Sequence, residues 1–418
     1  MRLVGGYLFA VLRTTSQRGS KVSTINFGKA RKSFFPSTKN NCIDTRRRMS
    51  SYACTQSSQY DENTQSLIGK LKHPFPLVDV DCNLLHEDLT AIHTDSIDAI
   101  YQEVNSHLRI LHHPSTVASN IHGVFSPSST IDEAEKFFTV LSESTLKSRN
   151  QIDIRMSLGV HPYHTNIDDI GNLSEIESEV TERVATLIEK DSLNDCKLIT
   201  CIGETGLDYS DGFPDREVQL PWFEYQLKLA KKYNLPLFLH ERLAFDDTIA
   251  LIEKVFTEED ARPPIIIHCF TGNKEECEKY VKEGFYISVS GYILKNGEGP
   301  EEVRECLRNG IIPMDKLMIE TDAPYMGFNS CRGTYYQVET QINEEFQALN
   351  GKKKKRLMKG IYPNVPSSLP KIFDYAVELI NDGRKERGEE ALNVENAART
   401  FFQNSINFFG LQLKYNLD

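Results

Sequence analysis

Short apolar runs alternate with amphipathic stretches along most of the chain after residue 76. Eight of these runs have the pattern of strands buried on both faces, such as the three isoleucines that lead to His268. The stretches between them have helical spacing, as in 215–234, where Val218, Trp222 and Leu229 share one face. The eight runs cover residues 77–84, 118–126, 152–162, 197–209, 235–242, 263–272, 285–292 and 316–325.

Strands that alternate with helices at this interval predict right-handed crossovers and a parallel sheet. Eight such units predict a (β/α)8 TIM-type barrel, and a doubly wound open sheet is the alternative. After the eighth run, residues 347–370 predict an irregular excursion, and residues 371–410 predict a closing helical region. The chain shows no internal repeat, so we expect a single α/β domain over residues 71–418.

Residues 1–70 differ from the rest of the chain in composition. The first 60 residues hold eleven Lys and Arg residues against a single acid, Asp44, so they carry +10 and the remainder carries −21 of the net −11. They are rich in Ser and Thr and keep no helical or strand period. We expect a flexible basic arm, with a mitochondrial targeting segment or a tail that reaches nucleic acid as alternatives.

The compartment and the partners follow from the same composition. The longest apolar run, at residues 3–12, falls well short of the roughly 20 residues that a membrane span needs. Nine cysteines without a C-x-x-C pair indicate reduced thiols inside a cell. We expect a cytoplasmic protein if translation starts at Met49, and mitochondrial import becomes available if it starts at Met1; nuclear import through the arm is a further alternative. The sequence indicates no membrane association and no obligate protein partner, and it leaves the oligomeric state open.

Four polar residues stand where predicted strands end: Glu204, His240, His268 and Asp322. In an α/β barrel those ends form one face, and active sites are assembled there from different strands. Any one of the four could be an ordinary loop acid or a capping residue. Two imidazoles and two carboxylates together are ligands for a divalent metal, and burying two carboxylates without a cation is costly. The pattern therefore predicts a metal site.

Four motifs in chain order, GETGLDY, LHER, HCFTG and IETDAPY, resemble the signatures of the TatD family of metal-dependent deoxyribonucleases. The stretch SLGVHPYH, residues 157–164, is similar to the same pattern, and the resemblance runs from about residue 77 to the closing helices. It implies an amidohydrolase-type (β/α)8 barrel that hydrolyses DNA phosphodiester bonds with Mg²⁺ or similar ions. It further implies 3′-to-5′ exonuclease trimming, with nicking as a second mode, in DNA repair or apoptotic DNA fragmentation.

The resemblance also implies residue roles. Glu204 would be a carboxylate able to bridge two metal ions, His240 and His268 would be imidazole ligands, and Asp322 would bind metal and orient or deprotonate the attacking water. His161 would contact a phosphate, with a capped loop histidine as the alternative. Arg242 could hold a phosphate through two hydrogen bonds, or it could be a solvated arginine.

The chain departs from the family pattern on the first strand. Asp81 and Asn83 stand where many relatives have histidines; Asp81 can still offer oxygen to a hard cation, whereas Asn83 is a poor ligand. We therefore expect one or two Mg²⁺ or Mn²⁺ ions and a DNA substrate, which the basic run Lys352–Arg356 would help to bind. The alternatives are a barrel that hydrolyses small amides, lactones or phosphoesters, and a non-catalytic barrel scaffold.

Overall fold

The structure is a computed structural model, which describes residues 60–92, 104–166, 171–257 and 261–415. Residues 1–59 of the predicted basic arm lie outside the described residues, so the arm stays a prediction. The last residues of the same range form helix α1 (Glu62–Leu71), whose first turn is capped by Asp61 accepting a hydrogen bond from the Thr64 amide at 2.7 Å. Helix α1 packs against α3 (Pro114–Ala118) and α11 (Gly333–Ile342), so it is part of the folded unit that follows.

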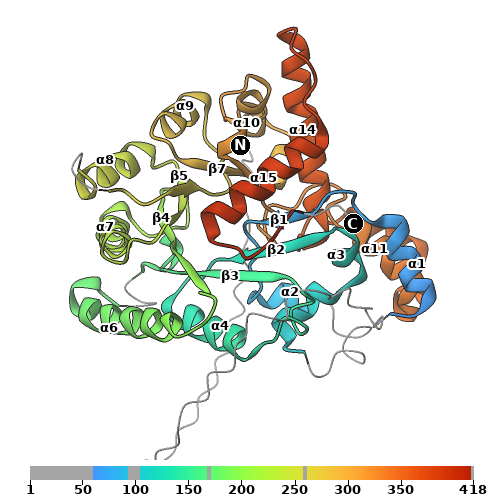
Figure 1. Ribbon diagram of the computed structural model, residues 1–418, viewed down its shortest axis with the longest axis horizontal. Helices are drawn as coiled ribbons and strands as arrows, with labels where there is room; N and C mark the ends of the chain where they lie inside the picture. The colour runs from blue at the N-terminus through green and yellow to red at the C-terminus, as the bar shows by residue number, and fades with distance from the viewer. Residues whose placement is uncertain (1–59, 93–103, 167–170, 258–260, 416–418) are drawn as a thin grey trace, which may run out of the picture. The chain divides into compact units, whose positions relative to one another are not determined.

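Eight parallel strands lie side by side in the order of the sequence (Figure 1). Each strand lies inside one of the eight predicted apolar runs, because buried Leu, Val and Ile side chains fill both faces of the sheet. Sequential order confirms the barrel and contradicts the doubly wound alternative. The strands are β1 (Leu77–Asp79), β2 (Ile121–Ser126), β3 (Asp153–Leu158), β4 (Ile199–Asp208), β5 (Leu237–Arg242), β6 (Ile265–Ile267), β7 (Tyr286–Val289) and β8 (Leu317–Ile319).

The sheet closes between β8 and β1 just beyond the ends of both strands. The Asp322 amide donates to the Asp81 carbonyl at 2.9 Å, and the Asn83 amide donates to the Ala323 carbonyl at 2.8 Å. The fully buried Asp79 carboxylate accepts from both the amide and the hydroxyl of Thr321, at 2.8 and 2.6 Å. These bonds fix the first and last strands to each other at the carboxyl end of the barrel.

Helices connect the strands and surround the sheet in Figure 1. Helix α7 lies within the predicted helical stretch 215–234, and its buried face includes Trp222 and Leu229. The helices not yet given are α2 (Glu87–Ala91), α4 (Ile131–Glu143), α6 (Leu173–Ser192), α7 (Arg216–Tyr233), α8 (Phe245–Val255), α9 (Lys274–Lys282), α10 (Glu298–Arg308), α12 (Glu344–Ala348), α13 (Gly351–Lys359), α14 (Leu369–Glu386) and α15 (Val394–Phe409).

The prediction of an irregular excursion over residues 347–370 is wrong. Helix α13 occupies residues 351–359, because consecutive Lys and Arg residues are good helix formers and Asn350 caps the first turn by accepting from the Lys353 amide at 2.9 Å. Helix α13 is anchored through Leu357, which packs on a small hydrophobic cluster that includes Tyr336 and Phe346. The connection after β8 therefore contains regular helices, and the exposed lysines of α13 give it a basic surface.

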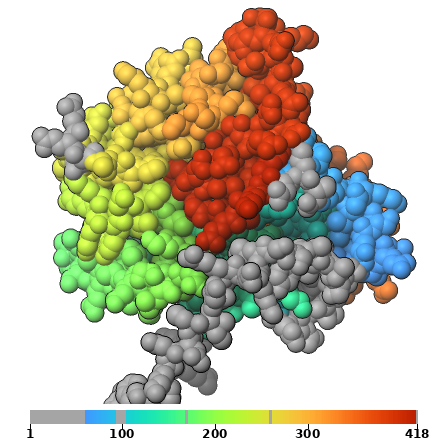
Figure 2. All heavy atoms as spheres, viewed as in Figure 1, coloured from blue at the N-terminus to red at the C-terminus, as the bar shows by residue number. Residues whose placement is uncertain are grey.

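Helix α15 covers the amino end of the barrel, and its atoms form a continuous surface across that face (Figures 1 and 2). Phe402, Phe408 and Phe409 pack with residues that point into the barrel, including Val78 and Met318. With this end filled by aromatic side chains, the polar residues at the other end of the strands define the functional face. No helix among the described residues is long and apolar enough to cross a membrane.

Candidate metal centre

Glu204 lies on β4, where two glycines let the strand run very close to β5. A side chain at Gly203 would approach the Phe238 carbonyl to 2.4 Å, and one at Gly206 would approach the His240 carbonyl to 1.8 Å. Both glycines have a positive φ, near 140°, which other residues rarely adopt. The two glycines therefore let β4 approach β5 closely, and this brings Glu204 beside His240.

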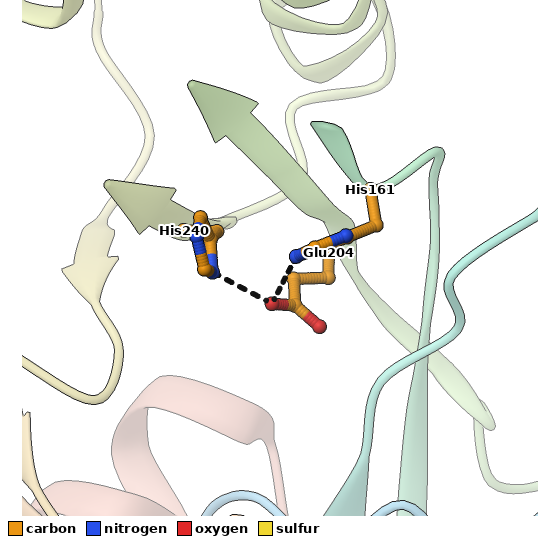
Figure 3. Close-up of side chains that lie close together, drawn as sticks. All are labelled: His161, Glu204 and His240. Atoms are coloured by element: carbon orange, nitrogen blue, oxygen red, sulfur yellow. Dashed lines mark ion pairs between the residues drawn. The ribbon is translucent and has the colours of Figure 1, made fainter. Parts of the chain in front are cut away.

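One carboxylate oxygen of Glu204 faces three imidazoles. Its Oε1 lies 3.3 Å from His161 Nε2, 3.3 Å from His240 Nδ1 and 2.8 Å from His268 Nε2. Figure 3 shows His161 and His240 converging on this oxygen from the loops and strands on either side. Burial by itself raises the pKa of Glu204, but the adjacent imidazoles outweigh it and hold the pKa well below its usual range. Glu204 is therefore an anion at the centre of the site.

His240 is held in place by a second carboxylate. Its Nε2 lies 2.8 Å from Asp208 Oδ2, which fixes the ring so that Nδ1 faces Glu204. Burial lowers the pKa of His240, but hydrogen bonds to Asp208 and Glu204 raise it to about 9. Asp208 itself is fully buried. Its contact shows that it orients His240, an arrangement that carboxylates commonly provide for metal-ligating imidazoles.

A second buried group surrounds His268. Its Nδ1 lies 3.0 Å from Asp81 Oδ2 and 3.6 Å from Glu320 Oε1, and all three side chains are at most 4% exposed. Neither contact is a hydrogen bond, and both ring nitrogens of His268 and these two carboxylate oxygens have no hydrogen-bond partner. Burial raises the pKa of Asp81 well above its usual range. Unpartnered polar atoms at such depth are uncommon and costly unless a cation or water satisfies them.

Asp322 completes the site from the turn after β8. It adopts a left-handed backbone conformation with φ of 51°, and burial raises its pKa to about 7. Asn83 bridges two acids, since its side-chain amide lies 3.4 Å from Asp322 Oδ1 and 3.3 Å from Asp81 Oδ1. Asn83 thus organises the carboxylates of the first and last strands.

The structure brings seven of the eight predicted site residues into this centre and places the eighth at its rim. Arg242 is exposed at the end of β5, two residues beyond His240 on the same side of the strand. The sequence missed Glu320, which is fully buried and accepts from Ser288 at 2.6 Å. Its position two residues before Asp322, in IETDAPY, was the available signal. The seven are Asp81, Asn83, His161, Glu204, His240, His268 and Asp322.

The donor set fits a divalent cation. Potential ligand atoms of His161, Glu204 and His240 all lie within 4.8 Å of one another, and so do those of Asp81, His268 and Glu320. Carboxylate oxygens suit Mg²⁺ and Mn²⁺, and imidazole nitrogens also accept Mn²⁺ and heavier ions. The two groups share Glu204 as a neighbour, because its Oε1 contacts an imidazole of each.

The eight-stranded parallel barrel, with carboxylates and imidazoles gathered at its carboxyl end, has the architecture of the amidohydrolase-type barrels. Within that class, the chain belongs to the TatD related DNase family, whose pattern matches residues 86–410. The matched region begins after Asp81 and Asn83, the two positions at which the first strand departs from the family signature. The family is metal-dependent, and the donor set described above agrees with that property.

Known proteins resemble the chain in both sequence and structure. The 3′-5′ ssDNA/RNA exonuclease TatD of Erwinia tasmaniensis is 35% identical over 168 residues, which are 40% of this chain and 57% of that protein. The protein of the same name from Escherichia coli K12 is 34% identical over the same shares. The chain thus spans somewhat over half the length of these relatives.

Solved structures agree on the fold. An uncharacterized amidohydrolase from Saccharomyces cerevisiae has a TM-score of 0.58 at 20% identity, over 80% of this chain and all of that one. A TatD family hydrolase from Entamoeba histolytica has a TM-score of 0.56 at 21% identity, over 81% of this chain and 99% of that one. At these identities the two structures show the barrel architecture alone.

Proposed function

We propose that this protein is a metal-dependent deoxyribonuclease that hydrolyses DNA phosphodiester bonds, mainly as a 3′-to-5′ exonuclease that also nicks, in DNA repair or apoptotic DNA fragmentation. One observation carries the proposal: three imidazoles converge on a single oxygen of Glu204, beside buried carboxylates with unpartnered atoms. Such a set suits one or two divalent cations, for which we propose Mg²⁺ or Mn²⁺ because the carboxylates of Asp81, Glu204, Glu320 and Asp322 all lie in the centre. The names of the related exonucleases support a nucleic-acid substrate.

The proposed ligands are Glu204, His240, His268 and Asp322, and the contact of His161 with Glu204 adds a fifth candidate. A bound divalent cation supplies Lewis acidity and lowers the pKa of a water molecule. In this proposal Asp322 accepts the proton of the attacking water, because its carboxylate lies beside the other acids that would hold the cation. Asp208 keeps the imidazole of His240 in one orientation while the charge in the site changes.

Two side chains can hold the phosphate, His161 inside the centre and Arg242 at its rim. His161 is 15% exposed at its side chain, and its Nε2 borders the oxygen of Glu204. Arg242 makes no ion pair within the described part of the chain, so its guanidinium is available for two parallel hydrogen bonds to phosphate oxygens. Both residues therefore border the place where a phosphodiester would meet Asp322.

The proposal is tested with purified protein on end-labelled DNA. Single- and double-stranded oligonucleotides labelled at either end distinguish exonucleolytic trimming from nicking. A matched RNA strand tests whether the substrate must contain deoxyribose. Hydrolysis that requires added Mg²⁺ or Mn²⁺ and stops with EDTA supports the nuclease. Activity confined to small lactones, amides or phosphotriesters would establish the amidohydrolase alternative, and no hydrolysis of either class with stoichiometric bound metal would establish a scaffold.

We expect metal affinity to rise as the pH increases from about 7 to about 9. With pKa values of about 9 for His240 and about 7 for Asp322, His240 holds a proton over most of this range and Asp322 holds part of one near pH 7, and a cation must displace both. For the same reason the metal-free protein binds these protons more tightly when folded. The His240 contribution to stability is complete below pH 6.5 and is lost as the pH rises to about 9.

Calorimetric titration with Mn²⁺ in buffers of different ionisation enthalpy measures both the affinity and the protons released. Thermal unfolding of the metal-free protein should show a melting temperature that falls over the same pH range. An affinity that stays constant between pH 7 and 9, with no proton release, would contradict the assignment of these two ligands.

We expect the basic helix α13 to contribute to nucleic-acid affinity. Replacing Lys352, Lys353 and Lys355 with Ser should weaken binding of single-stranded DNA and reduce the slope of log affinity against log salt by about 0.7 for each lost contact. These lysines make no ion pair with any described residue, so no internal contact is lost. Fluorescence anisotropy over a series of salt concentrations measures the slope.

A matched control replaces Lys147, Lys190 and Lys197, which are exposed and precede β3 and β4 at the amino end of the barrel. This variant changes the net charge by the same amount but lies away from the proposed site. If both triple variants change the slope equally, the effect is one of net charge, and α13 has no specific role.

A further inference from the structure

Large hydrophobic side chains are exposed mainly at the functional end of the barrel. Nine such side chains are exposed among the described residues, and six of them lie in connections that follow the carboxyl ends of strands. Four of the six belong to the single connection between β8 and α14. An exposed aromatic or aliphatic patch on one face of a soluble domain marks a binding surface. The six are Tyr163, Leu243, Tyr325, Met358, Ile361 and Tyr362.

Two of these residues form an aromatic shelf with His86, which precedes α2. The rings of Tyr325 and Tyr362 have centroids 6.5 Å apart, and His86 meets Tyr325 edge to face at 5.3 Å. Tyr325 is 39% exposed and Tyr362 is 45% exposed. The shelf is thus assembled from two connections, the one after β1 and the one between β8 and α14, and its tyrosine rings keep exposed surface.

The shelf is fixed beside the metal centre. Asn364, two residues after Tyr362, donates its amide to the Pro324 carbonyl at 2.7 Å and its side chain to the Thr321 carbonyl at 2.8 Å. Tyr325 follows Asp322 by three residues, which places their Cα atoms within about 11 Å. A nucleotide whose phosphate reaches Asp322 can therefore place a neighbouring base on the shelf.

The charges around the shelf suit a neutral ring and exclude a phosphate. The Tyr362 hydroxyl donates to Asp88 Oδ2 at 2.5 Å, so the polar edge of the ring already faces an anion. Helix α13 ends at Lys359, three residues before Tyr362. Its lysines make no ion pair with described residues, so they can bind the phosphates of the nucleotides next to the stacked base. Aromatic faces bordered by cations are the usual platform for bases of a single strand. In a duplex these base faces are stacked inside the helix, so only an unpaired base can use the shelf.

We propose that the Tyr325–Tyr362 shelf is a stacking subsite for one unpaired nucleobase of a single-stranded nucleic acid whose neighbouring phosphate lies at the metal centre. This inference rests on the proposed nuclease function, and it adds to that function a preference for single strands. It requires no base-specific hydrogen bond, so binding should tolerate any of the four bases.

The test measures binding, so it does not depend on catalysis. The probe is a nuclease-resistant phosphorothioate single strand with 2-aminopurine near its 3′ end, in the presence of Mg²⁺, and its partner is the same strand with an abasic site at that position. Tyr362→Leu removes the aromatic face and keeps apolar bulk, whereas Tyr362→Phe keeps the face and loses only the bond to Asp88. We expect Tyr362→Leu to weaken binding of the base-containing strand about tenfold, to abolish 2-aminopurine quenching and to leave the abasic strand unaffected. Tyr362→Phe should bind like the unchanged protein.

A location control is Tyr415→Leu, because Tyr415 packs edge to face on Phe402 at the amino end of the barrel. It should leave both affinities unchanged. The inference is overturned if Tyr362→Leu weakens both strands equally, if it weakens neither, or if it changes only the sedimentation coefficient of the protein, which would make the shelf an interface between protein chains. A protein that binds the strands as expected but cuts no DNA would overturn the proposed function and leave the stacking subsite in place.

Discussion

Asp322→Asn is expected to lower DNA hydrolysis by at least about 10²-fold. The amide keeps the shape of the side chain and tolerates the left-handed backbone at this position, where φ is 51°. It loses the negative charge that binds a cation and the basicity that accepts a proton from water. The measurement is kcat on an end-labelled single strand at saturating Mg²⁺ or Mn²⁺, after contaminating nuclease has been excluded.

Stability supplies the control for this variant. In the metal-free protein, Asp322 lies near other buried acids, including Glu320 and Glu204, and their charges help to raise its pKa. Removing its charge should therefore leave the melting temperature unchanged or slightly higher. Asn83→Ala, in the same cluster, should cost much less activity because a neutral amide is a poor ligand. Near-normal hydrolysis by Asp322→Asn would refute the proposed role of this residue.

Glu204→Gln is expected to lower hydrolysis by a similar factor and to weaken metal binding directly. A neutral amide replaces the oxygen that three imidazoles share, at 2.8 to 3.3 Å. The pKa of His240, which Glu204 helps to raise to about 9, should fall toward its ordinary value. Titration of the histidine resonances by NMR follows that change, and calorimetry with Mn²⁺ measures the lost affinity.

The matched control is Glu241→Gln on the same strand as His240. Glu241 is 8% exposed, and its carboxylate accepts from the Tyr280 hydroxyl at 2.9 Å and from the Ala244 amide at 2.8 Å, away from the metal centre. Its replacement should leave activity within about threefold of the unchanged protein, since no ligand is lost. Combining Glu204→Gln with His240→Ala or His268→Ala should cost little more than either change alone, because the residues act as a unit. Additive losses would show that they act independently.

The barrel could be predicted because each buried strand is a separate apolar run. The isoleucines of β6 fill both faces of the sheet, and the pattern stops where His268 begins, so strand and ligand are adjacent in sequence. Helix α13 escaped prediction because a run of lysines has no apolar period, although its helix propensity and its asparagine cap were present. Helix α1 lies in the range assigned to the arm for a similar reason, since a single face of a ten-residue helix gives a weak signal.

The four proposed ligands could be named from the sequence because each one closes an apolar run. The partners that orient them could not, because their roles depend on distance. Asp208 and His240 meet across adjacent strands, and nothing in either motif records that one holds the other at 2.8 Å. Glu320 looks like one acid among many in the sequence, and only burial beside His268 distinguishes it.

The closure of β8 on β1 has a consequence for the newly made chain. Thr321 donates a hydrogen bond to Asp79, 242 positions earlier in the chain, and the Asp322 amide donates to the Asp81 carbonyl. Contacts of such separation form late, after the intervening chain has been synthesised and its loop entropy has been overcome. A chain still on the ribosome therefore carries Glu204 and His240 without the last acid of the centre. We therefore expect the candidate metal centre to stay incomplete until the final strand closes the ring.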